Sequence, residues 1–137
     1  MKTTFILLFG AVGGILRYIL ESTIHLSSGF PLATLIINLS GSFALGFFYC
    51  LAVEKGISEW LRLGIGIGLI GGFTTFSTMS LELIQLSNHQ PELALGYLLA
   101  TILGGLALVH LGDFAAHLVN NPKHETPDSH NATEAYE

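Results

Sequence analysis

The sequence predicts an all-α membrane protein with four transmembrane helices, the third of which is interrupted. Half of the 137 residues are hydrophobic and only 11% are charged, which leaves too few charges to cover the surface of a soluble domain. The hydrophobic residues gather in four stretches, each long enough to supply the roughly 20 helical residues that cross a bilayer. A glycine pair and four hydroxyl side chains within the third stretch predict the interruption.

The first two spans are expected at about residues 4–24 and 32–53. Lys2 before the first run imitates the start of a signal peptide, but the run continues for about 20 residues and no small-residue cleavage site stands out. We therefore expect a retained helix. The second span follows the turn SSGFP, whose Pro31 can open a helix.

The third and fourth spans are expected at about residues 60–86 and 91–118. The connections, EKGISE and SNHQP among them, are short, so neighbouring helices must run antiparallel. Residues 120–137 combine proline and charge with almost no apolar side chains, and we expect a disordered tail there. The four-helix transmembrane domain therefore comprises residues 1–119.

The interruption is expected near Gly71 to Thr75, within the stretch GGFTTFSTM (residues 71–79). Non-helical backbone is tolerated inside a membrane only where it is buried in protein or lines a wet cavity, so a break implies a site. Its freed carbonyl oxygens can hold a cation, and the start of the following half-helix, near Ser77, can favour an anion. The alternative is an unbroken helix in which each hydroxyl bonds back to the carbonyl one turn earlier, from Thr74, Thr75, Ser77 and Thr78.

Polar side chains in two other spans extend this interpretation. Asn38 lies near the middle of the second span, and Tyr97, Thr101 and Gly105 recur every four residues on one face of the fourth. Such groups either join helices by hydrogen bonds or line a path through the membrane. A path of neutral donors, with phenylalanine edges that carry partial positive charge, suits a small, strongly hydrated anion.

Glycines at a spacing of four predict close helix packing, because small residues let helices approach each other in lipid. Gly10 and Gly14 have this spacing in the first span. In the third span Gly64, Gly68 and Gly72 repeat it. We expect these positions to mark helix interfaces.

Four motifs together resemble one known family: GGILRY (13–18), TLIINLSGSFALG (34–46), GGFTTFSTM (71–79) and YLLATILGG (97–105). Over the whole chain except the tail, the sequence resembles the Fluc/CrcB family of fluoride channels. The resemblance implies a compact four-helix subunit that pairs antiparallel with a second copy, in the manner of a dual-topology dimer, and forms two fluoride pores. It also implies passive fluoride export across the cell membrane, fluoride resistance, and a structural Na⁺ ion at the dimer centre.

The resemblance further implies roles for single residues. The Na⁺ ligands would be the backbone carbonyls of Gly71 and Thr74 from both subunits, and Arg17 would be the basic residue of the aqueous vestibule. Asn38 resembles the pore-lining amide, and Phe76 resembles the first of two rings that contact fluoride edge-on. The implied pore-lining set is Asn38, Phe76, Ser77, Met79, Glu82, Tyr97 and Thr101.

Two features depart from the family pattern. Met79 stands where the second ring is expected, so a flexible thioether replaces an edge-on donor. The basic residues are also uneven, which predicts both termini in the cytoplasm. Arg17 alone lies on the far side, against Lys2, Lys55, Arg62 and Lys123. The partner is therefore either a second copy or a sibling chain with a different charge bias.

Ionisable side chains also gather at the end of the fourth span, and the chain has one cysteine. His110, Asp113 and His117 share one helix face at the end of the fourth span, a pattern that can bind metal but is more often the wet end of a helix. The single Cys50 allows no intramolecular disulfide. We expect it to be a small buried hydrophobe.

Three other classes of function remain for comparison. An enzyme needs a base and an orienting partner beside its nucleophile, and the sequence offers only scattered single residues. We therefore do not expect enzymatic activity. A proton-coupled exporter of the small multidrug transporter type would use Glu82 as its membrane-embedded carboxylate. A non-conducting assembly protein would give no flux at all.

Overall fold

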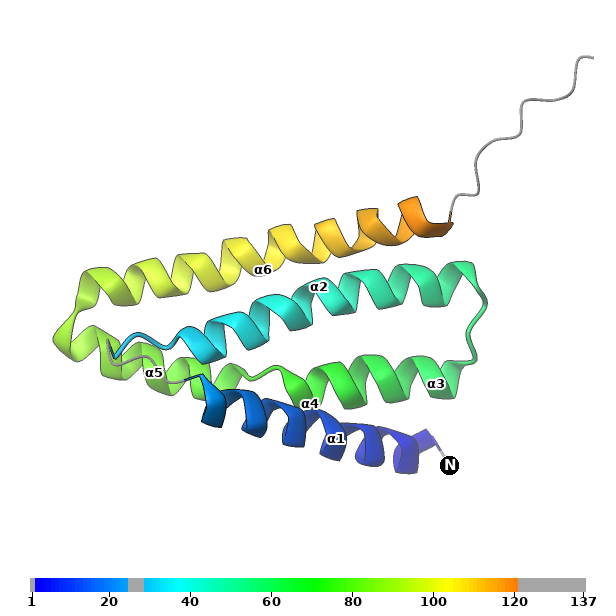
Figure 1. Ribbon diagram of the computed structural model, residues 1–137, viewed down its shortest axis with the longest axis horizontal. Coiled ribbons are helices and arrows are strands. Elements are labelled where there is room, and N and C mark those ends of the chain that lie inside the picture. The colour runs from blue at the N-terminus through cyan, green and yellow to red at the C-terminus, as the bar shows by residue number, and fades with distance from the viewer. Residues whose placement is uncertain (1, 25–28, 121–137) are drawn as a thin grey trace, which may run out of the picture.

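The computed structural model describes residues 2–24 and 29–120 (Figure 1). The helical elements are α1 (Lys2–Thr23), α2 (Leu32–Glu54), α3 (Glu59–Leu63), the π-helix η1 (Gly64–Ile70), α4 (Gly71–Phe73), α5 (Phe76–His89) and α6 (Pro91–Asn120). Four stretches are long and apolar enough to cross a membrane, namely α1, α2, the run Glu59–His89 and α6. The predicted all-α class and spans are confirmed. The predicted tail lies outside the described residues except for Asn120, which instead ends α6.

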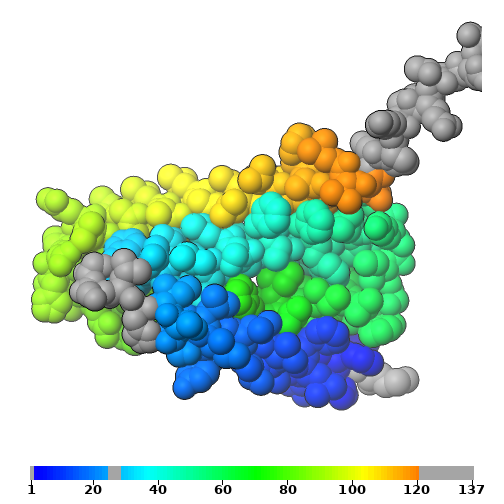
Figure 2. Space-filling model, viewed as in Figure 1, coloured from blue at the N-terminus to red at the C-terminus, as the bar shows by residue number. Residues whose placement is uncertain are grey.

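The four spans lie side by side as roughly antiparallel rods (Figure 1). α2 packs most extensively against α6, and α1 packs against η1 and α4. The space-filling view shows the same order on the surface, with α6 along one edge and α1 along the opposite edge (Figure 2). The antiparallel arrangement that the short connections predicted is therefore present.

A glycine turn reverses the chain after α2. The N–H of Ile57 donates to the carbonyl of Ala52 at 3.0 Å, and the N–H of Gly56 donates to the carbonyl of Val53 at 3.3 Å. Gly56 has a φ of 61°, a left-handed conformation that glycine adopts without steric cost. This turn satisfies two terminal carbonyls of α2 and directs the chain into α3.

α1 packs against the third span through positions where only glycine fits. A Cβ atom at Gly13 would lie 2.1 Å from the carbonyl oxygen of Leu69. Gly14 meets no other helix within the described subunit, because nothing lies within 4 Å of a Cβ atom built there. The spacing of four predicted a contact at Gly14, whereas the contact with the third span is made by the adjacent Gly13. The other predicted positions do meet close neighbours, as expected: Gly10, Gly64, Gly68 and Gly72.

α2 and α6 also approach each other backbone to backbone. A Cβ atom at Gly46 would lie 2.0 Å from the carbonyl oxygen of Val109, and one at Gly112 would lie 2.2 Å from that of Phe43. The spacing rule did not single out these two glycines. Because their neighbours are backbone atoms, which cannot move aside, they fix the register of α2 against α6.

The third span contains a π-helical segment before its break, which was not predicted from the sequence. Gly64–Ile70 form a π-helix, a rare form that is found frequently at functional sites. The glycines of this segment pack closely against their neighbours, since a Cβ atom at Gly66 would lie 2.9 Å from the ring of Tyr49 on α2. The glycines thus let the segment pack closely against both α1 and α2.

Candidate ion site at the interrupted helix

The third span is broken at two consecutive residues. α4 ends at Phe73, and Thr74 has a ψ of 158°. Thr75 is fully extended, with φ −143° and ψ 125°, and α5 begins at Phe76. The predicted interruption is therefore confirmed, and the predicted range is narrowed to Thr74 and Thr75.

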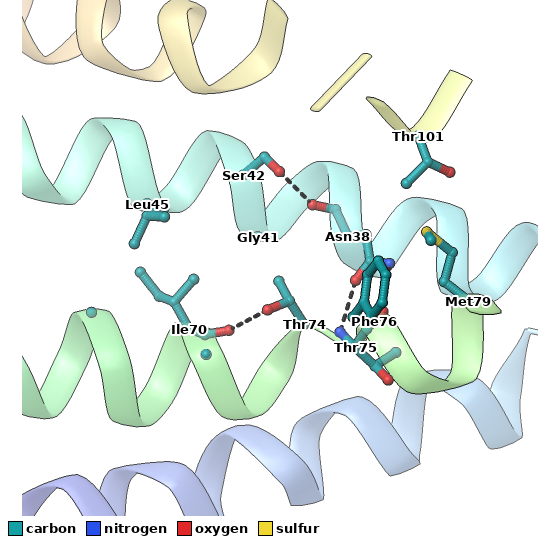
Figure 3. A pocket seen from close by; sticks show the side chains of 12 residues that line it. Asn38, Gly41, Ser42, Leu45, Ile70, Thr74, Thr75, Phe76, Met79 and Thr101 are labelled. Carbon is teal, nitrogen blue, oxygen red and sulfur yellow. Dashed lines mark hydrogen bonds between the residues drawn. The ribbon is translucent and has the colours of Figure 1, made fainter. Parts of the chain in front are cut away.

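Asn38 on α2 supplies the hydrogen-bond partners of the extended backbone at Thr75. Its Oδ1 accepts the N–H of Thr75 at 2.8 Å, and its Nδ2 donates to the carbonyl of Thr75 at 2.9 Å (Figure 3). One carboxamide thus replaces both backbone bonds that this residue would have made inside a helix. Unpaired peptide groups in a membrane cost several kcal/mol each, so this pairing is what makes the extended conformation tolerable.

The four hydroxyl groups have different partners, and that of Thr78 accepts a hydrogen bond from the hydroxyl of Thr75 at 3.0 Å. Thr75 caps α5, since its Oγ1 accepts the N–H of Thr78 at 3.2 Å. Ser77 has its hydroxyl 3.4 Å from the same oxygen. Thr74 donates to the carbonyl of Ile70 at 3.1 Å. The alternative of hydroxyls that fold back onto their own helix therefore applies within this motif to Thr74 only.

The break leaves peptide groups of both polarities free. In the described residues, no hydrogen bond reaches the carbonyl oxygens of Gly71 and Thr74. Likewise the N–H groups of Phe76 and Ser77, at the start of α5, donate to no partner within that part of the chain. These are the unsatisfied groups that a helix end and a helix start leave. They can bind a cation and an anion respectively.

A cavity of about 290 Å³ lies beside the break. Seven residues named from the sequence line it, from α2, the third span and α6, and Figure 3 shows most of them as sticks: Asn38, Gly71, Thr74, Thr75, Phe76, Met79 and Thr101. Gly41 gives this region its shape, because a Cβ atom there would lie 2.2 Å from the Cγ2 of Thr74. The side chains of Phe76 and Met79 differ in exposure, since the ring is 78% exposed and the thioether is buried.

Other predicted residues form a separate network. Glu82 accepts a hydrogen bond from Tyr97 at 2.9 Å and another from Thr34 at 2.8 Å. Tyr97 is only 1% exposed, and it does not line the cavity beside the break. Arg17 lies 3.9 Å from Glu21, measured from Nε to Oε1. Glu21 and Glu82 line another cavity, of about 340 Å³, between the ends of the spans.

Two residues of the site have roles that were not predicted from the sequence. Thr75 was expected to be one of four similar hydroxyls, but it is the cap and the partner of Asn38. A threonine followed by an apolar helix, with another hydroxyl three residues later, is a recognisable capping signal. Gly41 lies one turn after Asn38, and that spacing places both on one face of α2.

Four membrane-spanning stretches, of which the third is broken beside a cavity that carries amide and hydroxyl groups, define a multi-pass membrane protein of the channel or transporter class. Comparison with known proteins narrows this class. The family described as "CrcB-like protein, Camphor Resistance (CrcB)" matches residues 4–113. The chain belongs to this family.

Its curated relatives are named as fluoride channels. "Fluoride-specific ion channel FluC 2" of Halalkalibacterium halodurans is 42% identical over 106 residues, which cover 75% of this chain and 76% of the relative. "Fluoride-specific ion channel FluC 1" of Moorella thermoacetica is 45% identical over 113 residues, covering 80% and 79%. "Fluoride-specific ion channel FluC" of Methanopyrus kandleri is 38% identical over 111 residues, covering 80% and 85%. The motif-based resemblance is confirmed, and these names are those of ion channels rather than enzymes.

Proposed function

We propose that this chain is a subunit of a fluoride-specific channel in the cell membrane, through which fluoride leaves the cell passively. The observation that carries the proposal is the interrupted span, whose free peptide groups lie beside a cavity lined by a carboxamide and a phenylalanine ring. The family and the names of its members support fluoride as the ion. Fluoride resistance of the host cell would follow from this activity.

The donors left for an anion follow from the hydrogen bonds already made. The carboxamide of Asn38 has two N–H bonds and gives one to Thr75, so the second remains for the cavity. The N–H groups of Phe76 and Ser77 add two donors at the start of a helix, where negative charge is favoured. The edge of the Phe76 ring adds a weaker positive contact. These are neutral donors that can replace hydration without trapping the ion.

We also propose that Thr101 and Tyr97 line the pore, although in this structure their hydroxyl protons are donated to other groups of the subunit. Thr101 donates to the carbonyl of Tyr97 at 2.8 Å, and Tyr97 donates to Glu82. Their oxygens therefore act as acceptors until the protons turn away from these partners. Met79 contributes a polarizable wall to the cavity. Arg17, paired loosely with Glu21, is proposed to attract fluoride at the entrance.

A structural Na⁺ ion is proposed at the break. The carbonyl oxygens of Gly71 and Thr74 fit this role, because they are uncharged oxygen ligands without hydrogen-bond donors in the described residues. One subunit offers only these two, so a filled coordination shell needs the same pair from a second subunit. The ion would supply positive charge at the point where the subunits meet.

The proposed assembly is a pair of subunits, either two copies or one copy with a sibling chain. The exposed ring of Phe76 and the exposed backbone of Gly71 support it, since both lie at the polar break rather than on an apolar lipid-facing surface. Lipid cannot satisfy the free peptide groups there, whereas a second subunit can cover them.

Efflux from liposomes tests the proposed function. We expect purified protein to release trapped fluoride, recorded with a fluoride electrode, and Phe76→Ala to lower the rate by about tenfold, which corresponds to about 1.4 kcal/mol. Phe114→Ala is the matched control, because this ring is also exposed but lies on α6 away from the cavity. Absence of efflux from the unmodified chain would support the non-conducting class instead.

The exporter alternative is tested at Glu82. We expect Glu82→Gln to retain fluoride efflux, because the amide oxygen of glutamine still accepts a bond from Tyr97 or Thr34. We also expect no proton movement with fluoride, recorded with a pH dye inside the liposomes. An exporter would lose all flux in this variant and would couple protons to fluoride in the unmodified chain.

A further inference from the structure

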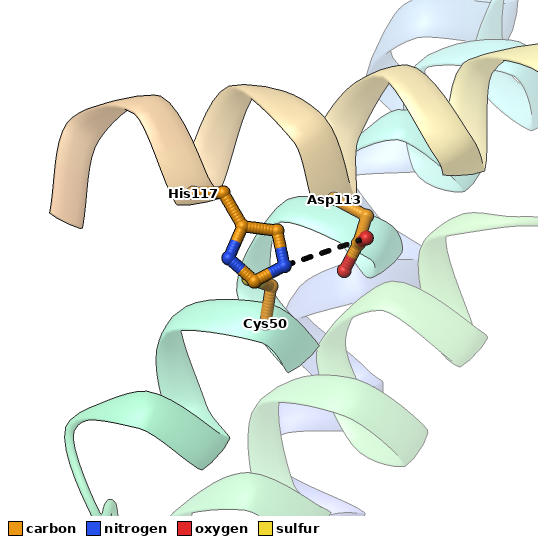
Figure 4. A group of neighbouring side chains, drawn as sticks. All are labelled: Cys50, Asp113 and His117. Atoms are coloured by element: carbon orange, nitrogen blue, oxygen red, sulfur yellow. Dashed lines mark ion pairs between the residues drawn. The ribbon is translucent and has the colours of Figure 1, made fainter. Parts of the chain in front are cut away.

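A second cluster of ionisable side chains lies at the other end of the α2–α6 pair. One potential ligand atom from each of Cys50, Asp113 and His117 lies within 4.8 Å of the others (Figure 4). Glu54 joins them, and the group lines a cavity of about 300 Å³. Cys50 comes from α2 and the other two residues come from α6, so their meeting could not be predicted from spacing along the chain. His110 is not part of the cluster.

The backbone contacts between α2 and α6 hold the cluster together. Cys50 lies one turn after Gly46, and Asp113 directly follows Gly112. At both glycines the two helices meet without room for a side chain. The distance between Cys50 and the α6 residues is therefore set by the rigid part of the fold rather than by mobile loops.

The orientation of the His117 ring resembles that of a metal ligand. Its Nδ1 lies 2.6 Å from Oε1 of Glu54, while its Nε2 faces Oδ2 of Asp113 at 3.8 Å. The longer distance exceeds that of a hydrogen bond. Histidines that bind metal through one nitrogen almost always donate the other N–H to a carboxylate or carbonyl group. Glu54 is placed to be that acceptor.

We propose that Cys50, Asp113 and His117 bind a divalent transition-metal ion of the zinc type, with Glu54 orienting the imidazole. Tetrahedral zinc sites keep their ligand atoms about 3.3–3.7 Å apart, so the cluster has to contract by roughly 1 Å. The side chains of Asp113 and His117 are 54% and 55% exposed and can rotate to do so. The metal binds the thiolate, and the thiol proton of Cys50 is released to solvent.

The chemistry of the ligands decides which ion fits. Thiolate and imidazole prefer zinc and related ions over magnesium or calcium, which favour oxygen ligands. The thiolate and the carboxylate together balance the two positive charges of the ion. A bound ion would connect α2 to α6 and stabilise the folded subunit at a distance from the fluoride path.

A simple ion pair is the competing explanation. A doubly protonated His117 between Glu54 and Asp113 would need no metal and no part for Cys50. The two explanations differ in whether sulfur binds the ion, and a thiolate bound to Co²⁺ gives a charge-transfer absorption band. Because the chain has a single cysteine, such a band can come only from Cys50.

The test is a Co²⁺ titration of the purified full chain in detergent after treatment with a chelator. We expect one equivalent of Co²⁺ to produce the thiolate band and Zn²⁺, but not Mg²⁺, to abolish it. Cys50→Ser should lose the band, and His117→Ala should weaken binding by at least about tenfold. His110→Ala is the matched control on the same helix and should bind as the unmodified chain does.

Several outcomes would overturn the proposal. The first is absence of the band in the unmodified chain, and the second is a Co²⁺ affinity that His117→Ala leaves unchanged. Elution on size exclusion identifies any misfolded variant, and Cys50→Ala serves as a second substitution at the buried position. Fluoride efflux of the chelator-treated chain is expected to be unchanged, so the metal site and the channel can fail independently of each other.

Discussion

Asn38→Ala is expected to lower fluoride efflux by at least about tenfold and to reduce the stability of the subunit. The change removes both hydrogen bonds to Thr75 and leaves its N–H and carbonyl without partners. A buried polar group that loses its partner costs about 1–3 kcal/mol, so the two together cost several. The variant also removes the free N–H that faces the cavity. Efflux from liposomes and thermal unfolding in detergent measure the two effects.

Two further substitutions separate the role of Asn38 from that of its helix. Ser40→Ala changes a hydroxyl of the same helix that donates only to its own turn, at Ile37, and it should leave both measurements unchanged. Asn38→Asp keeps an acceptor for the N–H of Thr75 but faces its carbonyl with another acceptor, so it should also be impaired. If Asn38→Ala conducted and melted like the unmodified chain, the extended conformation at Thr75 would not depend on α2.

Gly13→Ala is expected to destabilise the fold by about 1–3 kcal/mol, the usual range for overpacking. The added methyl group would lie 2.1 Å from the carbonyl oxygen of Leu69 and 2.9 Å from the backbone nitrogen of Phe73. Both are backbone atoms of the third span, so α1 must move away. Since Phe73 directly precedes the break, efflux should fall as well. Thermal unfolding and size exclusion report the packing, and the electrode reports the flux.

The adjacent Gly14→Ala is the matched control. Nothing lies within 4 Å of a Cβ atom at this position, and alanine favours a helix over glycine by up to about 1 kcal/mol. We therefore expect unchanged or slightly higher stability. Equal destabilisation by both substitutions would mean that helix propensity or expression, rather than contact with the third span, controls the result.

The spans and the break could be predicted because they depend on local chemistry. Runs of apolar residues end at EKGISE and SNHQP, and the pair Gly71–Gly72 with its neighbouring threonines has low helix propensity, although the glycines themselves remain helical and the break lies at Thr74 and Thr75. The partner of Asn38 could not be predicted, because Thr75 lies 37 residues away and only the packed fold brings it near.

The contrast between local sequence and packing between helices also explains what was not predicted about Gly13 and Cys50. A spacing of four selects a helix face, but it cannot say whether Gly13 or Gly14 points at the neighbouring backbone. Cys50 was expected to be a small buried hydrophobe, and its burial is confirmed. Its position beside Asp113 and His117 follows only from the register of α2 against α6.

The glycine contacts also join the helices of the subunit into two rigid pairs. α1 is fastened to the first half of the third span, and α2 is fastened to α6, in each case by backbone touching backbone. The cavity beside the break draws its walls from both of these stiff units. Any sliding or tilting of one unit against the other, such as a change in bilayer thickness imposes on membrane helices, must therefore deform the cavity before it deforms either unit.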